Sequence, residues 1–207
     1  NANDKFCFVH FGTHVRKMHS SERGAFRSVN SKPLVKIFAD GAREYLSENY
    51  PRRKDNEEKE LELMNKFDNK VAVFKIRPGF DVSELKFYEK SSYKGIILEG
   101  TGLGHAPVTV LDKETKHHKE ILSTIRGMCK KMIVVMATQC VYGPVNMNVY
   151  STGRDLLEAG VIPANMLAET AYVKLGWALG NSKGIKGARE LFLRNVAGEI
   201  SERLMPE

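Results

Sequence analysis

A glycine-rich turn near the middle of the chain is the first place where chemistry could occur. It comprises residues 100–105, Gly-Thr-Gly-Leu-Gly-His, and directly follows the apolar run Gly95–Glu99. Such glycines let the backbone bend sharply and approach a ligand closely, at the carboxyl edge of a parallel sheet where ligands usually bind. A nucleotide-binding fingerprint would pass straight into a helix, whereas Ala106 and Pro107 intervene here. The segment predicts a substrate-edge loop, with a phosphate loop or a plain turn as alternatives.

A second polar segment also leaves the end of an apolar run. Residues 138–150, Thr-Gln-Cys-Val-Tyr-Gly-Pro-Val-Asn-Met-Asn-Val-Tyr, follow Ile133–Ala137. They carry hydroxyls, amides and phenols with almost no charge, and such groups could hold the amide and carboxylate of a small amino-acid substrate. A loop that satisfies its own backbone would have the same composition, so that alternative stays open.

Lys17 is a third candidate, in the run His-Val-Arg-Lys-Met-His at residues 14–19. A lysine can deprotonate a hydroxyl nucleophile when its neighbours or desolvation shift its pKa, although most lysines are only solvated charges. His10, His14 and His19 match no common metal-ligand spacing and have no acidic residue among them. We therefore expect no metal site.

The elements that position these loops alternate between strand and helix from Val71 onward. We expect strands at Val71–Ile76, Gly95–Glu99 and Ile133–Ala137. Between them lie a helix with the capping box Asp81/Glu84, ending near Lys90, and a helix with one apolar face between Ile121 and Cys129. This order implies a parallel sheet with right-handed crossovers. Three further helices are expected at about 151–158, 165–179 (ending at Gly180) and 185–204.

The first fifty residues predict short strands and a hairpin instead of alternating strands and helices. Phe6–Phe11 is typical of a buried strand, and residues 12–30 of a loop with a turn at Gly24. Leu34–Phe38 and Arg43–Leu46, joined by Asp40-Gly41, predict a hairpin. The charged residues 51–67 are expected to form a linker, which divides the chain into domains at 1–50 and 68–207.

Composition narrows the class of protein. The 207 residues are 42% hydrophobic and 28% charged, as in globular proteins, and no apolar run is long enough to suggest a membrane span. Three widely spaced cysteines without a Cys-x-x-Cys pair favour a reducing, cytoplasmic setting. The net charge of +7 is compatible with an RNA partner or with plain solubility, since the basic residues are scattered. An opening without Met, and strand-like sequence within five residues, suggest a fragment.

Together these segments resemble the C-terminal domain of the L-asparaginase family. The resemblance lies in residues 93–105 and 138–150 and continues through 151–154, 159–162 and 166–177. His14–Phe26 resembles the family segment that carries an active-site lysine, which would be Lys17. The match runs over the whole chain apart from 51–66. Glu-Gly-Thr-Gly-Leu-Gly-His combined with Thr-Gln-Cys and Asn-Met-Asn-Val-Tyr is typical of one branch, the amidase (D-type) subunits of archaeal glutamyl-tRNA(Gln) amidotransferases.

The resemblance implies an α/β fold, with a flavodoxin-like C-terminal domain and the tail of an N-terminal α/β domain. It implies cleavage of a side-chain amide, of glutamine or asparagine, by a threonine nucleophile assisted by a second threonine, an aspartate and the lysine. The ammonia would pass to a partner, the E-type subunit of the amidotransferase, which uses ATP and Mg to convert Glu-tRNA(Gln) to Gln-tRNA(Gln). No cofactor is expected in this chain itself. The family also implies a homodimer in which the C-terminal domain closes the active site of its mate, with Asn146, Tyr150 and Thr101 near that site.

The chain departs from the family pattern at the nucleophile. The segments that carry the nucleophilic threonine and the Thr-Asp pair have no counterpart in it, because Thr101 and Thr138 belong to C-terminal motifs. We therefore expect the chain alone to be inactive. Two other functions remain open: a cytoplasmic L-asparaginase acting on free asparagine, and an interaction module without chemistry.

Overall fold

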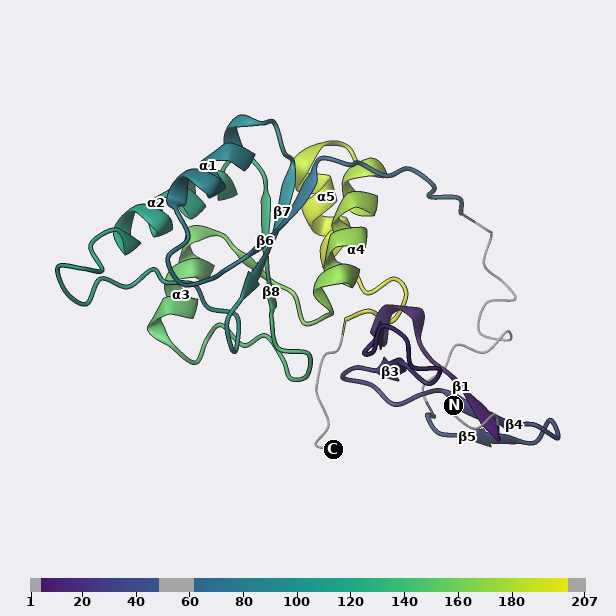
Figure 1. Cartoon of the computed structure of the whole chain (residues 1–207). Helices are drawn as coiled ribbons and strands as arrows, with labels where there is room; N and C mark the ends of the chain where they lie inside the picture. The colour runs from purple at the N-terminus through teal and green to yellow at the C-terminus, as the bar shows by residue number, and fades with distance from the viewer. Residues whose placement is uncertain (1–4, 49–61, 201–207) are drawn as a thin grey trace. The chain divides into compact units, whose positions relative to one another are not determined.

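The computed structural model describes residues 5–48 and 62–200, and the chain divides into two compact units between Met64 and Asn65 (Figure 1). Residues 51–61 of the expected linker lie outside the described residues. Residues 62–70 form no helix or strand. Each unit is described separately below.

The first unit is built from short antiparallel strands. Its three-stranded sheet has the order β1-β4-β5, and Phe6 pairs with Phe38 in the register of β1 and β4. The strands of this sheet are β1 (Phe6–Val9), β4 (Val35–Phe38) and β5 (Arg43–Tyr45). Between β4 and β5, Gly41 adopts φ +87° and its amide donates to the carbonyl of Phe38. The structure thus confirms the hairpin predicted around Asp40-Gly41.

Two predictions for the first unit are wrong. Residues 12–30 are not an irregular loop: they hold a 3₁₀ turn (Gly12–His14) and an antiparallel pair, β2 (Val15–Lys17) with β3 (Phe26–Ser28). Three-residue strands rich in basic side chains lack the apolar alternation that predicts a strand. The strand at Phe6–Phe11 is shorter than expected and not buried, since Phe8 and Val9 are each 38% exposed.

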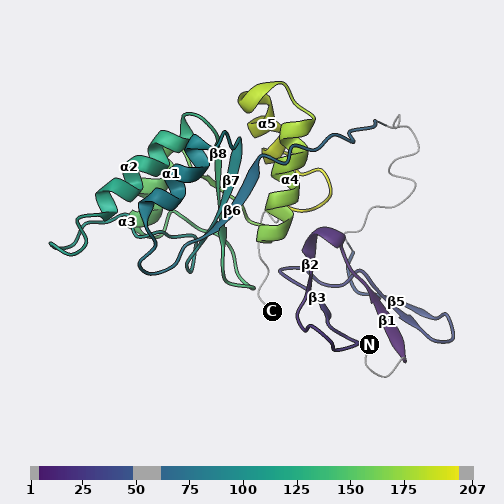
Figure 2. The same cartoon turned by 45° about the horizontal axis from the view of Figure 1, so that its top comes forward.

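The second unit contains a four-stranded parallel sheet with the order β6-β7-β8-β9. The strands are β6 (Val71–Lys75), β7 (Gly95–Gly100), β8 (Ile133–Thr138) and the two-residue β9 (Ile162–Pro163). Helices α1, α2 and α3 cover one face and α4 and α5 the other (Figures 1 and 2). The predicted three-strand parallel core is confirmed, whereas β9 was not predicted because two residues carry no periodic signal.

The central strands are apolar on both faces, as expected for a parallel sheet covered on both sides. Alternate residues of β7 enter different cores: Ile96 and Leu98 pack with α1 and α2, and Ile97 packs with α4 and α5. Leu85, Ile121 and similar side chains complete the first core. This two-sided burial fixes the register and direction of the strands, and therefore where their carboxyl ends lie.

The helices follow the predicted order. They are α1 (Val82–Lys90), α2 (His118–Cys129), α3 (Ser151–Ala159), α4 (Ala168–Gly180) and α5 (Gly184–Leu193). The capping box at α1 is confirmed: Asp81 accepts from the amide of Ser83, and Glu84 accepts from the amide of Asp81.

The predicted helix end at Gly180 is confirmed, because Gly180 is the last residue of α4. A Cβ there would lie 2.6 Å from the amide nitrogen of Phe67, so glycine is needed for close packing. The end of the last helix, in contrast, needs correction. The last helix was predicted to run to about residue 204, but α5 ends at Leu193. Arg194 is extended, with ψ 137°, and residues 194–200 form a loop held against α4; residues 201–204 lie outside the described residues.

Candidate functional site

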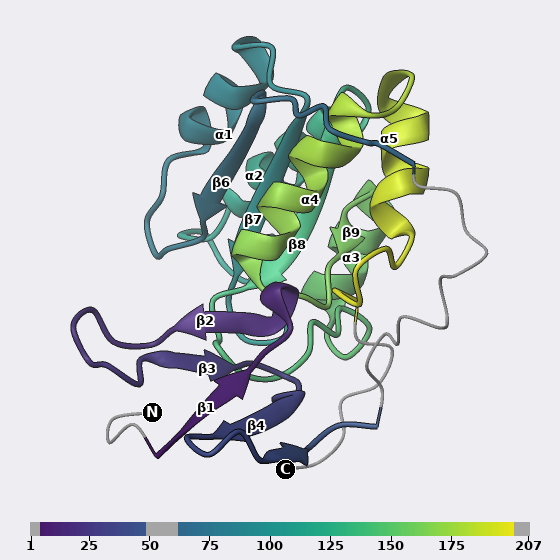
Figure 3. The same cartoon turned by 90° about the vertical axis from the view of Figure 1, so that its right-hand side faces the viewer.

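The polar segments singled out in the sequence meet at the carboxyl edge of the second unit's sheet. Strands β6, β7 and β8 run in the same direction, so their carboxyl ends share one edge (Figure 3). The 100–105 turn leaves β7 and the 138–150 loop leaves β8 at this edge. Parallel α/β sheets usually bind ligands there.

The 100–105 turn is closed by its own backbone. Thr101 and His105 exchange two hydrogen bonds of 3.0 Å between their amides and carbonyls. Gly102 and Gly104 both have positive φ, +51° and +99°. A Cβ on Gly104 would also lie 2.9 Å from Val145, so this position requires glycine for conformation and for space.

Residues at the end of β8 fasten the turn. The hydroxyl of Thr138 donates to the carbonyl of Gly102 over 2.5 Å, and the amide of Gln139 donates to the carbonyl of Gly100 over 2.9 Å. Farther along the loop, the amide of Asn146 donates to the carbonyl of Leu103 over 2.9 Å. The two polar segments therefore form one hydrogen-bonded cluster.

His105 connects this cluster to the start of α3. Its Nδ1 lies 3.1 Å from the hydroxyl of Thr152, and its ring packs edge-on against Tyr150 with 5.3 Å between centroids. Its Nε2 is enclosed and has no hydrogen-bond partner within residues 5–48 and 62–200. Burial lowers the pKa of His105 below its ordinary value of 6.5, which favours the neutral ring.

Three of the predicted site residues lie in this cluster. Thr101 begins the turn, Asn146 is tied to it, and Tyr150 stands at the N-terminus of α3 against His105. The side chains of Asn146 and Tyr150 are exposed, Tyr150 by 59%. The cluster thus offers an amide, a phenol and a hydroxyl to solvent, groups that can bind a polar substrate by hydrogen bonds.

Lys17, the predicted catalytic residue, belongs to the first unit. It ends β2, is exposed, and its Nζ donates to the carbonyl of Ser20 over 2.9 Å. The hydrogen bond between the amide of Met18 and the carbonyl of Ala25 continues the β2–β3 pairing just beyond it. The lysine therefore extends from a hairpin rather than from the loop expected there.

Sequence reasoning did not identify His105, Thr152 or Gln139 as individual site residues. His105 and Gln139 stood inside the two motifs, but a sequence motif does not show which of its side chains are enclosed. The contact between His105 and Thr152 joins residues 47 positions apart, and only the folded chain creates it.

Within the described parts of the chain, no group of three or more His, Cys, Asp or Glu residues is arranged to hold a metal ion. No helix there is long and apolar enough to cross a membrane. The three cysteines differ: Cys7 and Cys140 are exposed, whereas burial raises the pKa of Cys129 to about 11. A thiol with such a pKa is inert at neutral pH.

The family follows from the parallel sheet, its loop cluster and the sequence together. Residues 70–192 match the model of the glutaminase/asparaginase C-terminal domain, and the chain belongs to this family. Among particular members, it is 48% identical over 200 residues to a protein named as the D-type subunit of glutamyl-tRNA(Gln) amidotransferase, from Thermococcus kodakarensis. That match covers 96% of this chain and 42% of the relative.

Other archaeal relatives bear the same name. The protein from Pyrococcus furiosus is 44% identical over 205 residues (99% of this chain, 44% of that protein), and that from Methanothermobacter thermautotrophicus is 44% identical over 202 residues (97% and 43%). The chain thus spans a little over two fifths of the length of these relatives.

Solved structures confirm the asparaginase fold. The thermostable L-asparaginase from Thermococcus kodakarensis superposes with a TM-score of 0.79 at 32% identity, covering 95% of this chain and 56% of that one. L-asparaginase I from Vibrio cholerae also superposes with a TM-score of 0.79, at 26% identity, and the match covers 96% of this chain and 56% of that one. The predicted α/β class and the resemblance to the L-asparaginase family are both confirmed.

Proposed function

We propose that this chain forms part of the amide-hydrolysing subunit of a glutamyl-tRNA(Gln) amidotransferase, which releases ammonia from glutamine or asparagine for the synthesis of Gln-tRNA(Gln). The observation that carries the proposal is the similarity to the archaeal D-type subunits, 44–48% identical over at least 96% of this chain. The asparaginase structures named above share less of their sequence with the chain, at 26–32%.

The carboxyl-edge cluster would contribute binding groups rather than the nucleophile. Tyr150, Asn146 and Thr101 present neutral polar groups, which suit the uncharged amide of glutamine or asparagine. His105, whose Nε2 is enclosed, would support the phenol of Tyr150 by ring packing rather than touch the substrate itself. In a homodimer these residues would close the active site of the mate, as the family resemblance implies.

Lys17 would act in the chemical step. In the proposed reaction a threonine hydroxyl attacks the amide carbonyl, a base takes its proton, ammonia leaves, and water hydrolyses the acyl-enzyme. The lysine amine would shift the proton balance of the threonine-aspartate pair. Because those segments have no counterpart among the 207 residues, the chain by itself would release little or no ammonia.

The partners follow from the same proposal. The E-type subunit would bind the ATP and Mg and activate the glutamate on tRNA(Gln), so this chain needs no cofactor of its own. The reaction would take place in the cytoplasm, where glutamyl-tRNA is made and used. The positive charge of +7 is compatible with proximity to RNA.

Ammonia release by the intact protein tests the proposal. Glutamine and asparagine are each supplied to the protein alone, with the E-type subunit, and with that subunit plus Glu-tRNA(Gln), ATP and Mg. We expect the complete mixture to produce Gln-tRNA(Gln) and to release the most ammonia. Rapid asparagine hydrolysis that is independent of tRNA would instead identify an L-asparaginase. Binding to the E-type subunit without hydrolysis would identify an interaction module.

A further inference from the structure

Gln139 joins three strand ends at the carboxyl edge through one side chain and one amide. Its Nε2 donates to the carbonyl of Ile76, just beyond β6, over 2.5 Å and to the carbonyl of Glu99 in β7 over 2.8 Å. Its backbone amide donates to the carbonyl of Gly100 over 2.9 Å. The residue itself follows β8 directly.

These contacts fix the orientation of the side-chain amide. A carboxamide has one donor end and one acceptor end, and the two carbonyls of Ile76 and Glu99 can only accept. The nitrogen must therefore face them and the oxygen must point away. Glutamate and methionine have side chains of the same length but no suitable donor. Glutamine is therefore the residue type of this length that can donate to both carbonyls without bringing a charge.

The position of the contacts shows what they hold. Glu99 and Gly100 are the last residues of β7 before the turn, and Thr138, next to Gln139, fastens the turn's third residue through the carbonyl of Gly102. The turn carries Thr101 and His105, and His105 in turn contacts Tyr150. Gln139 thus acts on the base of the turn, and its hydrogen bonds named above reach none of these three side chains.

We propose that Gln139 is a positioning residue, which sets the place of the 100–105 turn and thereby of the polar groups that face the substrate. The proposal concerns how that site is held and rests on the proposed amide-hydrolysing function for its kinetic consequence. Displacing groups that bind or orient a substrate by about 1 Å can lower the rate on the order of 100-fold. Releasing the base of the turn is expected to have an effect of roughly 10- to 100-fold.

The test uses the intact protein with the E-type subunit and two variants, Gln139→Met and Gln139→Glu. Methionine keeps the length and removes the donors; glutamate turns an acceptor toward two carbonyls. Asn181→Ala is the matched control, because Asn181 is another carboxamide that joins separate segments: its Nδ2 donates to the carbonyl of Lys66 over 2.7 Å, beyond the opposite end of the sheet strands. The readouts are kcat and KM for glutamine, the thermal midpoint, and amide hydrogen exchange.

We expect all three variants to remain folded. Only the Gln139 variants should lose kcat/KM by roughly 10-fold or more. In these variants the amides of Thr101 and His105, which are hydrogen-bonded within the turn, should exchange faster while the amides of β7 and β8 stay protected. In the Asn181 variant, kcat/KM should stay within about twofold. Unchanged kinetics and exchange in both Gln139 variants would refute the positioning role. Failure of both to fold, with Asn181→Ala folded, would also refute it, because Gln139 would then determine the fold.

The exchange measurement separates this inference from the proposed function. If the intact protein released no ammonia from either amide, the proposed function would fail, while faster exchange confined to the turn would still support the role of Gln139. If the protein is active and the turn amides are unaffected by Gln139→Met, the inference fails alone.

Discussion

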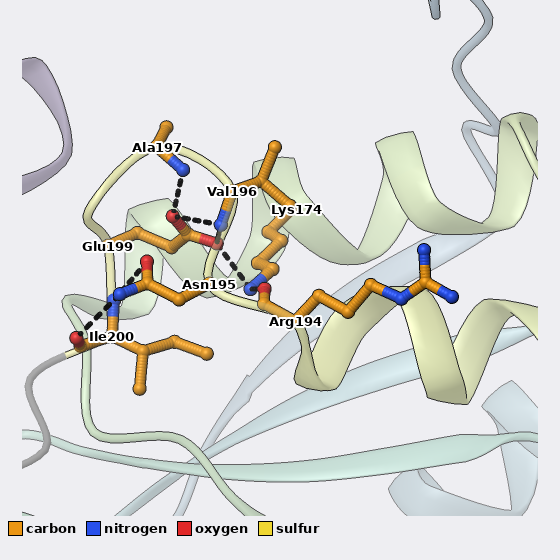
Figure 4. Close-up of polar contacts among 7 residues, drawn as sticks. All are labelled: Lys174, Arg194, Asn195, Val196, Ala197, Glu199 and Ile200. Atoms are coloured by element: carbon orange, nitrogen blue, oxygen red, sulfur yellow. Dashed lines mark hydrogen bonds and ion pairs between the residues drawn. The ribbon is translucent and has the colours of Figure 1, made fainter. Parts of the chain in front are cut away.

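Lys174 of α4 and Glu199 of the C-terminal loop form an ion pair that is almost removed from solvent, with 5% and 3% of their side chains exposed (Figure 4). The amine of Lys174 also donates to the carbonyl of Arg194 over 2.5 Å. Glu199 accepts from the amides of Val196 and Ala197. The pair fastens residues 194–200, which follow the end of α5 at Leu193, to α4.

Removing one partner of this pair should strongly destabilise the second unit. In Lys174→Met the carboxylate of Glu199 stays buried without its cation, and we expect a loss of about 3 kcal/mol in the free energy of unfolding. The control is Lys86→Met, which breaks the exposed pair Lys86–Glu120 and should leave that free energy nearly unchanged, because solvent screens an exposed pair. Urea unfolding followed by the fluorescence of Trp177, the single tryptophan, measures both. Equal effects would contradict a buried, structural pair.

The same carboxylate should make stability depend on pH. Burial alone would raise the pKa of Glu199, but hydrogen bonds from Lys174 and the loop amides outweigh it, so the pKa lies below its ordinary value of 4.5. A depressed pKa in the folded state contributes stability above the unfolded pKa, and this contribution disappears as the pH falls through the folded value. Glu199→Gln should therefore flatten the loss of stability below about pH 4.5. If Glu199→Gln lost stability at acidic pH as steeply as the wild type, the pH dependence would have to come from other carboxyl groups.

Two helical glycines should respond oppositely to alanine. In α3, a Cβ on Gly153 would overlap the carbonyl of Met147, so Gly153→Ala should destabilise by about 1–3 kcal/mol. In α2, a Cβ on Gly127 would meet nothing within 4 Å, so Gly127→Ala should stabilise by about 0.5–1 kcal/mol. Thermal unfolding of the two variants decides this. A stabilised Gly153→Ala would mean that α3 can move away from the 138–150 loop.

His105 should remain neutral to lower pH than an ordinary histidine. Burial lowers its pKa in the folded state, so the unfolded chain binds the proton more readily and stability should fall as the pH drops below about 6.5. Titration of the His105 ring by NMR should give a pKa under 6.5. His105→Gln should remove the contribution of His105 to the pH dependence of stability. This contribution is measured as the difference in the free energy of unfolding between wild type and variant across the pH range. A ring pKa above 6.5 would show that burial does not dominate the protonation of His105.

Lys17 tests the proposed chemical step in the intact protein. Lys17→Arg keeps the charge on a group that cannot release its proton, and Lys17→Met removes the amine. If the amine serves the nucleophile, both should lower glutamine hydrolysis by roughly 100-fold, the scale of losing a proton-transfer partner. Lys36→Met, on β4 of the same unit, is the control and should stay within about twofold. Near wild-type turnover in Lys17→Arg would show that the amine is not required.

The sequence by itself determined the second unit's framework. Runs such as Ile133–Ala137 are apolar at every position, which favours a strand buried on both faces, and the Asp81/Glu84 capping box fixes the start of α1 through contacts three residues apart. These signals depend only on residues that are close in the sequence, so they can be recognised without knowledge of the fold. The glycine turn and the polar loop each follow a predicted strand directly. Because parallel strands bring their carboxyl ends together, the predicted sheet also indicated that both segments lie at a sheet edge where ligands bind.

Only the tertiary structure decided which side chains within those loops matter and how the ends of the chain pack. The enclosure of His105, the hydrogen bonds of the Gln139 side chain and the burial of Lys174 with Glu199 all depend on residues 25 to 63 positions apart. The short β2–β3 pair and β9 likewise depend on neighbours and not on their own composition. Burial and hydrogen-bond partners are properties of the surroundings of a residue, and in a folded chain those surroundings come from distant parts of the sequence.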